Sequence, residues 1–190
     1  MQFITISGLV IRSRKQGDSN KILKIASVDG LYSALCYNCN NPKSQLLFLN
    51  EPFVFAEFQF KKSKGDGLHI HSATLLKNFY NLRFSLEKIK VASEICQIIE
   101  KTIFENIHFP LNFVLNTLAI LENADEEKIK LILPFFTLRY LKEIGFSQET
   151  DNELINHIQF SKINRLYNIQ ISKNTLNQLA KYAKNALSQI

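Results

Sequence analysis

Short apolar runs alternate with turn-forming residues along the first part of the chain. The runs are rich in β-branched and aromatic residues, and glycine, asparagine, aspartate and proline separate them, as is typical of strands joined by turns. They cover residues 3–13, 21–28, 31–37, 52–60 and 68–76. Because there is no room for full helical crossovers, these runs favour a small antiparallel barrel, and the five-stranded OB-fold is the commonest of that size. Another small barrel or a half-sandwich would have the same strand count.

The apolar period becomes helical after Leu82. Apolar residues then recur at spacings of three and four, which predicts an amphipathic helix with Cys96 in its buried stripe. The stripe consists of Leu86, Ile89, Ala92, Cys96, Ile99 and Ile103. Cys96 is therefore expected to be a core residue and not a reactive thiol.

Three further helices are predicted from the same periodicity. Residues 111–122 and 126–144 each form an apolar pattern, and Gly145 is the expected stop of the second. Pro134 lies inside that second pattern, so we expect a kink or two shorter helices there. The last helix is expected to begin after Ser172, whose side chain can cap its first turn.

The fold class predicted from these patterns is α+β in two domains. Residues 1–82 form an OB-fold nucleic-acid-binding barrel, and residues 83–190 form an all-α helical domain. Residues 147–171 are polar and poorly periodic, although a short helix over residues 154–164 is one possibility. No apolar run is long enough to span a membrane, no signal-peptide pattern opens the chain, and cysteines are few, so a cytoplasmic location is expected.

Charge is distributed unevenly over this plan. The formal net charge is +6, and residues 1–83 carry 11 Lys or Arg against 5 Asp or Glu. Residues 84–153 carry 7 basic against 12 acidic side chains, and the last 37 residues carry 5 basic and no acidic ones. A basic first domain favours a polyanionic partner such as nucleic acid, although surplus lysine also serves solubility.

Basic residues gather in and around the predicted turns of the first domain. They are Arg12, Arg14, Lys15, Lys21, Lys24, Lys43, Lys61, Lys62 and Lys64. In a small barrel such turns can converge on one rim and follow a phosphate backbone, where Tyr37 could stack on bases. They can also be separate solvated turns, since lysine is common in loops. The phenylalanines of residues 53–60 are expected to fill the barrel core.

The sequence offers two candidate metal-binding pairs and no common catalytic motif. Cys36 and Cys39 form a CxxC pair, which commonly supplies half of a zinc site, but the remaining cysteine, Cys96, and the scattered histidines do not complete it. His69 and His71 would share one face of a strand, which suits an ordinary ladder pair better than a metal site. There is no Gly-rich phosphate loop, HExxH or GxSxG motif, so we predict no catalytic residue, cofactor or metal.

A series of short motifs also follows a characteristic order. The motifs are Gly8 to Leu23 (GLVIRSRKQGDSNKIL), Gly30, Pro42-Lys43-Ser44, Glu51-Pro52-Phe53, Glu57-Phe58, Lys64-Gly65, Ser72-Ala73, Leu82-Arg83 and the helical set Phe136, Leu138, Arg139, Leu141 and Gly145. In this order they resemble the RecO family of bacterial DNA repair and recombination mediators, from residue 1 to about residue 146. The resemblance implies an N-terminal OB-fold followed by a helical domain.

The resemblance also implies a non-catalytic function at the nucleoid. Family members bind single-stranded and double-stranded DNA, anneal complementary strands and help replace single-strand binding protein with the recombinase RecA. The implied partners are RecR, through the barrel, and the acidic C-terminal tail of single-strand binding protein, through the helical domain. Arg139 and Lys142 are the candidates for holding that tail.

Two departures from the family pattern leave alternatives open. Residues 36–41 (CYNCNN) replace a more basic segment, which suggests a neutral variant of a DNA-contacting loop in which Tyr37 or the asparagines make the contacts. Residues 147–171 contain no cysteine, so a short form without the family's zinc module is expected. The alternatives are a protein-binding adaptor with weak or no DNA binding, and an RNA-binding OB-fold protein.

Overall fold

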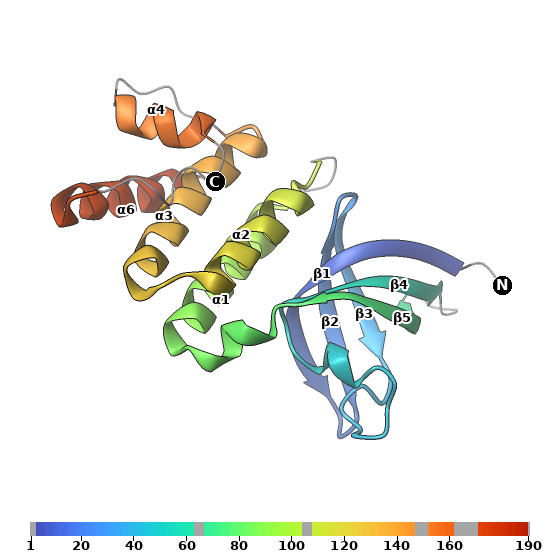
Figure 1. Ribbon diagram of the computed structural model, residues 1–190. Helices are drawn as coiled ribbons and strands as arrows, with labels where there is room; N and C mark the ends of the chain where they lie inside the picture. The colour runs from blue at the N-terminus through green and yellow to red at the C-terminus, as the bar shows by residue number, and fades with distance from the viewer. Residues whose placement is uncertain (1–2, 63–66, 104–107, 147–151, 162–170, 190) are drawn as a thin grey trace. The chain divides into compact units, whose positions relative to one another are not determined.

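The computed structural model describes residues 3–62, 67–103, 108–146, 152–161 and 171–189. The chain divides into two compact units, Met1–Tyr80 with Ile99–Leu111 and Asn81–Ile98 with Asn112–Ile190. The first unit holds all the described strands and the second holds most of the helices (Figure 1). The predicted α+β fold class is therefore confirmed.

The strands close into a barrel. They are β1 (Phe3–Gln16), β2 (Asn20–Ser27), β3 (Gly30–Cys36), β4 (Val54–Lys62) and β5 (Leu68–Asn78). The order around the barrel is β1-β2-β3-β5-β4, in which β3 and β5 are parallel and every other pair is antiparallel. This is the strand order of a five-stranded Greek-key OB barrel. Strand β1 pairs with two strands: its first half pairs with β4 and its second half pairs with β2.

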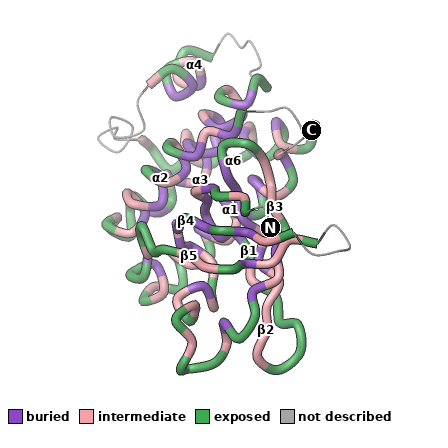
Figure 2. Tube along the Cα trace, turned by 90° about the vertical axis from the view of Figure 1, so that its right-hand side faces the viewer, coloured by how far each residue is buried: buried purple, intermediate pink, exposed green. Residues whose placement is uncertain are grey.

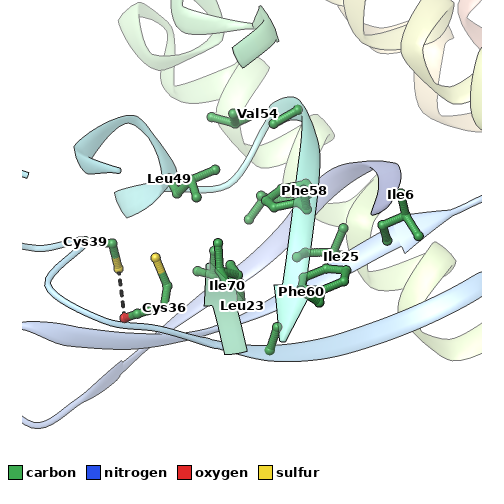
Figure 3. Packing of buried hydrophobic residues seen from close by; sticks show 13 residues of the cluster. Ile6, Leu23, Ile25, Cys36, Cys39, Leu49, Val54, Phe58, Phe60 and Ile70 are labelled. Carbon is green, nitrogen blue, oxygen red and sulfur yellow. Dashed lines mark hydrogen bonds between the residues drawn. The ribbon is translucent and has the colours of Figure 1, made fainter. Parts of the chain in front are cut away.

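Alternation of apolar and polar residues along β4 shows how the barrel is filled. Phe58 and Phe60 point inward and are fully buried, whereas Glu57 and Gln59, which alternate with them, are exposed. The rings of Phe58 and Phe60 stack with centroids 5.8 Å apart, and Ile25 of β2 packs in the same cluster (Figure 3). Inward phenylalanines on β4 therefore fill the core, as the sequence predicts.

The helices match the predicted periodic segments. They are α1 (Leu86–Thr102), α2 (Leu111–Asn123), α3 (Glu126–Glu143), α4 (Glu153–Phe160) and α6 (Lys173–Leu187), with 3-10 turns at Leu47–Asn50 and Tyr80–Phe84. Ser172 accepts a hydrogen bond from the amide of Thr175, which confirms the predicted cap of α6. Gly145, with φ of +88°, follows α3 as predicted. No helix in the described ranges is both long and apolar enough to cross a membrane.

Pro134 does not divide its helix, which excludes two shorter helices and leaves the kink as the remaining prediction. The helix α3 runs without interruption through this residue, which is itself buried. A proline inside a helix removes one backbone donor and costs roughly 3 kcal/mol. Here Phe135, Phe136 and Leu138 directly after it are buried, and the packing of these side chains offsets that cost.

One apolar cluster of the second unit forms between α3, α4 and α6. Its buried members are Phe135, Leu138, Ile155, Ile158, Leu179 and Ala183. The helix α4 thus covers an apolar face of α3, in agreement with the possibility of a short helix in this part of the sequence. Residues 162–164, which that possibility included, lie outside the described residues.

Candidate nucleic-acid interface

The β1–β2 hairpin carries the first group of predicted basic residues. Lys15 pairs with Lys21 across the hairpin, and Gly17, with φ of +73°, forms the turn beyond them. Arg14 and Lys15 are exposed, and Figure 2 shows the hairpin end in green and pink without a buried segment. Exposed cations near a hairpin tip form a suitable contact for a phosphate backbone.

Lys21 is turned toward the protein instead. Its Nζ donates to the backbone oxygen of Asn50 at 2.5 Å, and the hydroxyl of Ser13 donates to the same oxygen at 3.0 Å. These bonds fasten the 3-10 turn that precedes β4 to the hairpin. Lys21 is therefore engaged in holding the barrel together.

Arg12 and Lys24 face each other across β1 and β2 and share one carboxylate. Arg12 reaches Glu100 at 3.2 Å and Lys24 reaches it at 2.7 Å. Glu100 lies in the last turn of α1, the part of that helix that belongs to the barrel unit. The hydrogen bond from Lys24, together with both positive charges, holds the pKa of Glu100 below its usual value. Part of the predicted basic set is thus neutralised within the protein.

The CYNCNN segment is a turn that packs into the barrel and onto the hairpin. Cys36 and Cys39 are fully buried in the barrel core, and the Cys39 thiol lies 3.5 Å from the backbone oxygen of Cys36 (Figure 3). Asn38 has φ of 53°, and its amide donates to the Asn20 side chain at 3.0 Å. The side chain of Asn40 donates to the backbone oxygen of Asp18 at 3.2 Å.

The CxxC pair is therefore a packing feature of the barrel. The hydrogen bond between the two thiols lowers the pKa of Cys39, as does the positive charge of Lys21, and raises the pKa of Cys36. Within the described ranges no group of three or more His, Cys, Asp or Glu residues could hold a metal ion. Asn38 and Asn40 bond to the hairpin, whereas the Asn41 side chain accepts from the amide of Lys43 at 3.0 Å. Tyr37 is the exposed aromatic side chain of this turn, with 48% of its surface exposed.

The end of β4 carries the second group of predicted basic residues. Lys61 pairs with Phe3 of β1 on one side and with His69 of β5 on the other, and Lys62 pairs with Leu68. Lys64 lies outside the described residues.

The predicted set thus separates into free and engaged cations. Within the part of the chain that the structure describes, five members make no side-chain hydrogen bond, ion pair or ring contact. These are Arg14, Lys15, Lys43, Lys61 and Lys62. Arg12, Lys21 and Lys24 have partners inside the barrel unit. Cations without an internal partner are the ones that can neutralise phosphates at no cost in internal contacts.

The predicted pair in the helical unit is also engaged. Arg139 donates to the backbone oxygen of Gln159 and forms an ion pair with Glu143 one turn along α3. The Lys142 ammonium lies over the ring of Phe160, and partial burial and the nearby Arg139 lower the pKa of Lys142. Phe160, at the end of α4, is itself 71% exposed, so an apolar ring lies beside two cations of α3.

The sequence of the barrel is similar to that of a known protein family. Residues 1–79, which contain the whole barrel, match the family described as Recombination protein O N terminal. The barrel is thus similar to the N-terminal domain of RecO proteins. The RecO resemblance stated from the sequence motifs is therefore confirmed.

Similarity to RecO proteins extends beyond the barrel. The DNA repair protein RecO of Acetivibrio thermocellus is 23% identical over 233 residues, covering 100% of this chain and 92% of that protein. The RecO proteins of Caldicellulosiruptor saccharolyticus and Oceanobacillus iheyensis are each 28% identical, over 77% and 75% of this chain. The chain spans only 60% and 55% of those two relatives.

The alignment to the Acetivibrio RecO is longer than this chain of 190 residues, so segments of that protein have no counterpart here. Among solved structures, an aspartyl tRNA synthetase from Entamoeba histolytica is 12% identical with a TM-score of 0.30, over 72% of this chain and 32% of that one. That likeness is too low to carry an argument.

Two residues of the barrel are not candidates by sequence reasoning, although the structure places them beside aromatic rings. The HxH spacing predicts a ladder pair, yet His69 and His71 each contact an exposed aromatic ring. Tyr37 stacks on His69 with centroids 5.3 Å apart, and Phe3 packs against His71 in a tilted arrangement with centroids 4.9 Å apart. The sequence signal for these ring contacts is the HxH spacing on a strand. The aromatic partners, Phe3 and Tyr37, are identified only by the strand register of the barrel.

Proposed function

We propose that this protein acts in DNA repair and recombination as a non-catalytic DNA-binding mediator. In this role it binds single-stranded and double-stranded DNA, anneals complementary strands and, together with RecR, helps load the recombinase RecA onto strands coated with single-strand binding protein. The observation that carries the proposal is a closed barrel of the RecO N-terminal family whose hairpin and β4 end present cations without internal partners.

DNA would be held by the barrel domain, residues 1–82. The free cations Arg14, Lys15, Lys43, Lys61 and Lys62 supply the phosphate contacts, and Arg12, Lys21 and Lys24 contribute less because the protein already satisfies them. Phosphate contacts give affinity without sequence preference, which suits a protein that must act on any strand.

The acidic tail of single-strand binding protein would bind the helical domain, residues 83–190. A tail that combines carboxylates with apolar side chains needs a cation beside an exposed apolar surface. Lys142, Arg139 and the exposed ring of Phe160 supply both. RecR would bind the barrel. A protein that binds chromosomal DNA in this way would be located at the nucleoid.

A protein-binding adaptor is the second candidate. The observation that favours it is Glu100, which neutralises Arg12 and Lys24 and so removes two cations from any DNA surface. A DNA-independent complex with RecR, in the absence of DNA binding at physiological salt, would identify this function.

The test of the mediator is annealing of two complementary strands, one of them coated with single-strand binding protein. We expect the protein to accelerate annealing, and we expect Lys142→Ala to reduce this acceleration because the tail loses a cation. Lys181→Ala, which removes an exposed lysine from α6, is the matched control and should leave it unchanged. A protein that gives no acceleration at low salt, even with RecR present, would refute the mediator function.

A further inference from the structure

A row of aromatic and imidazole rings lies on the outer surface of the barrel. On β5, Ile70 points into the core and is 5% exposed, so its neighbours His69 and His71 point outward. Tyr37, from the turn after β3, stacks on His69 at an interplanar angle of 18°. Phe3, from the start of β1, packs on His71 at 40°. We call these four side chains the ring row.

Strand register brings the ring row together from distant parts of the sequence. Phe3 pairs with Lys61, and Lys61 pairs with His69, so one cross-strand line joins β1, β4 and β5. The register of β4 and β5 shifts between Gln59 and Phe60, which leaves His71 as an extra residue on β5. Such a bulge redirects a side chain, and here it places the His71 ring against Phe3.

The ring row is not explained by packing of the barrel. Phe58, Phe60 and Ile70 already fill the interior at this level. Phe3 and Tyr37 remain 46% and 48% exposed, and His71 is exposed as well. These rings do not fill the core, and they are not scattered singly over the surface. They lie in pairs on one face, which is a suitable surface for a flat ligand.

The charge beside the ring row fits an anionic ligand. Lys61 lies within the row, Lys62 follows it, and neither has an internal partner among the described residues. The next outward positions along the strands, Thr5, Gln59 and Ser72, are uncharged. No carboxylate therefore occupies the described register positions around the rings, and a phosphate would meet only lysine there.

We propose that Phe3, Tyr37, His69 and His71 form a stacking platform for the unpaired bases of single-stranded DNA, with Lys61 and Lys62 bound to its phosphates. This inference rests on the proposed DNA-binding function and adds a specificity to it. Every unpaired base offers a π-face to a ring, whereas a duplex keeps those faces inside its own stack. The platform should therefore favour single strands, while the hairpin cations bind both forms.

The experiment compares binding of fluorescent oligothymidine and of a mixed-sequence duplex to the full chain at one salt concentration. Tyr37→Leu and His71→Leu each remove a ring, and each should weaken oligothymidine binding about fivefold to a hundredfold. Tyr37→Phe and His71→Phe retain a ring and should bind as the wild type does. Duplex affinity should not change in any of these variants, because the lysines and Arg14 remain.

Matched controls separate the platform from general effects. Phe84→Leu removes a ring that is 73% exposed but lies outside the barrel unit, and it should not change binding. Leucine variants that bind oligothymidine as the wild type does, or that lose duplex affinity equally, would overturn the platform. A wild-type chain that binds neither DNA form would instead refute the proposed function. Binding of oligouridine without oligothymidine would overturn the assignment to DNA.

Discussion

Replacing Phe58 by alanine is expected to lower the free energy of unfolding of the barrel by about 3–5 kcal/mol. The side chain is fully buried, stacks on Phe60 and lies on the central inward face of β4. Removing the ring loses its transfer free energy and leaves a cavity that closed strands cannot fill by moving. Urea unfolding of the whole chain followed by circular dichroism would measure the loss.

The matched control for this change is Phe3→Ala. It makes the same substitution on the outer surface of the same barrel, where the ring is 46% exposed, and it should cost at most about 1 kcal/mol. If Phe58→Ala prevents folding, Phe58→Leu gives a smaller loss that can still be measured. Equal losses for Phe58→Ala and Phe3→Ala would contradict the assignment of Phe58 to the core.

Replacing Gly8 by alanine is expected to cost about 1–3 kcal/mol of stability through overpacking. A Cβ atom at Gly8 would lie 2.5 Å from Cγ2 of Ile25 and 3.1 Å from the backbone oxygen of Ala26. Both neighbours are fully buried on β2, where β1 crosses closely, so neither can move freely. The same unfolding experiment would measure this loss.

A second substitution tests whether the clash with Ile25 is the cause. Leucine lacks the branch at Cβ, so Ile25→Leu removes the Cγ2 atom that a residue at position 8 would meet. In the Gly8→Ala background, Ile25→Leu should therefore cost less than it does in the wild type, or even restore stability. Strictly additive losses in this double-mutant cycle would show that the contact with Ile25 is not the cause of the stability lost in Gly8→Ala.

The fold could be predicted largely because the local patterns agree with the packing. The five apolar runs lie within the five strands, with differences of a few residues at their ends. Of the phenylalanines expected in the core, Phe58 and Phe60 fill the barrel, whereas Phe55 is only half-buried. The division that Pro134 suggested does not occur, because a local rule for proline does not include the buried residues that stabilise α3 on both sides of it.

The site could be predicted less well, because contacts distant in sequence decide it. The basic set was visible in the sequence, but its division was not, since Glu100 lies 88 residues beyond Arg12. The CxxC pair suggested either zinc or a DNA-contacting loop, and its thiols lie in the barrel core. The ring row depends on a strand register and a bulge, which a single sequence does not specify.

The central claim is that the free cations of the barrel bind a phosphate backbone, and the salt dependence of single-stranded DNA binding tests it most directly. Affinity should fall steeply with salt, and Lys15→Ala with Lys61→Ala should flatten the slope of log affinity against log salt by about 1.4, or about 0.7 for each lost contact. Arg12→Ala with Lys24→Ala should flatten it less, because Glu100 already holds both side chains. Equal slopes for the wild type and the Lys15 and Lys61 variant, or no binding at low salt, would contradict the account.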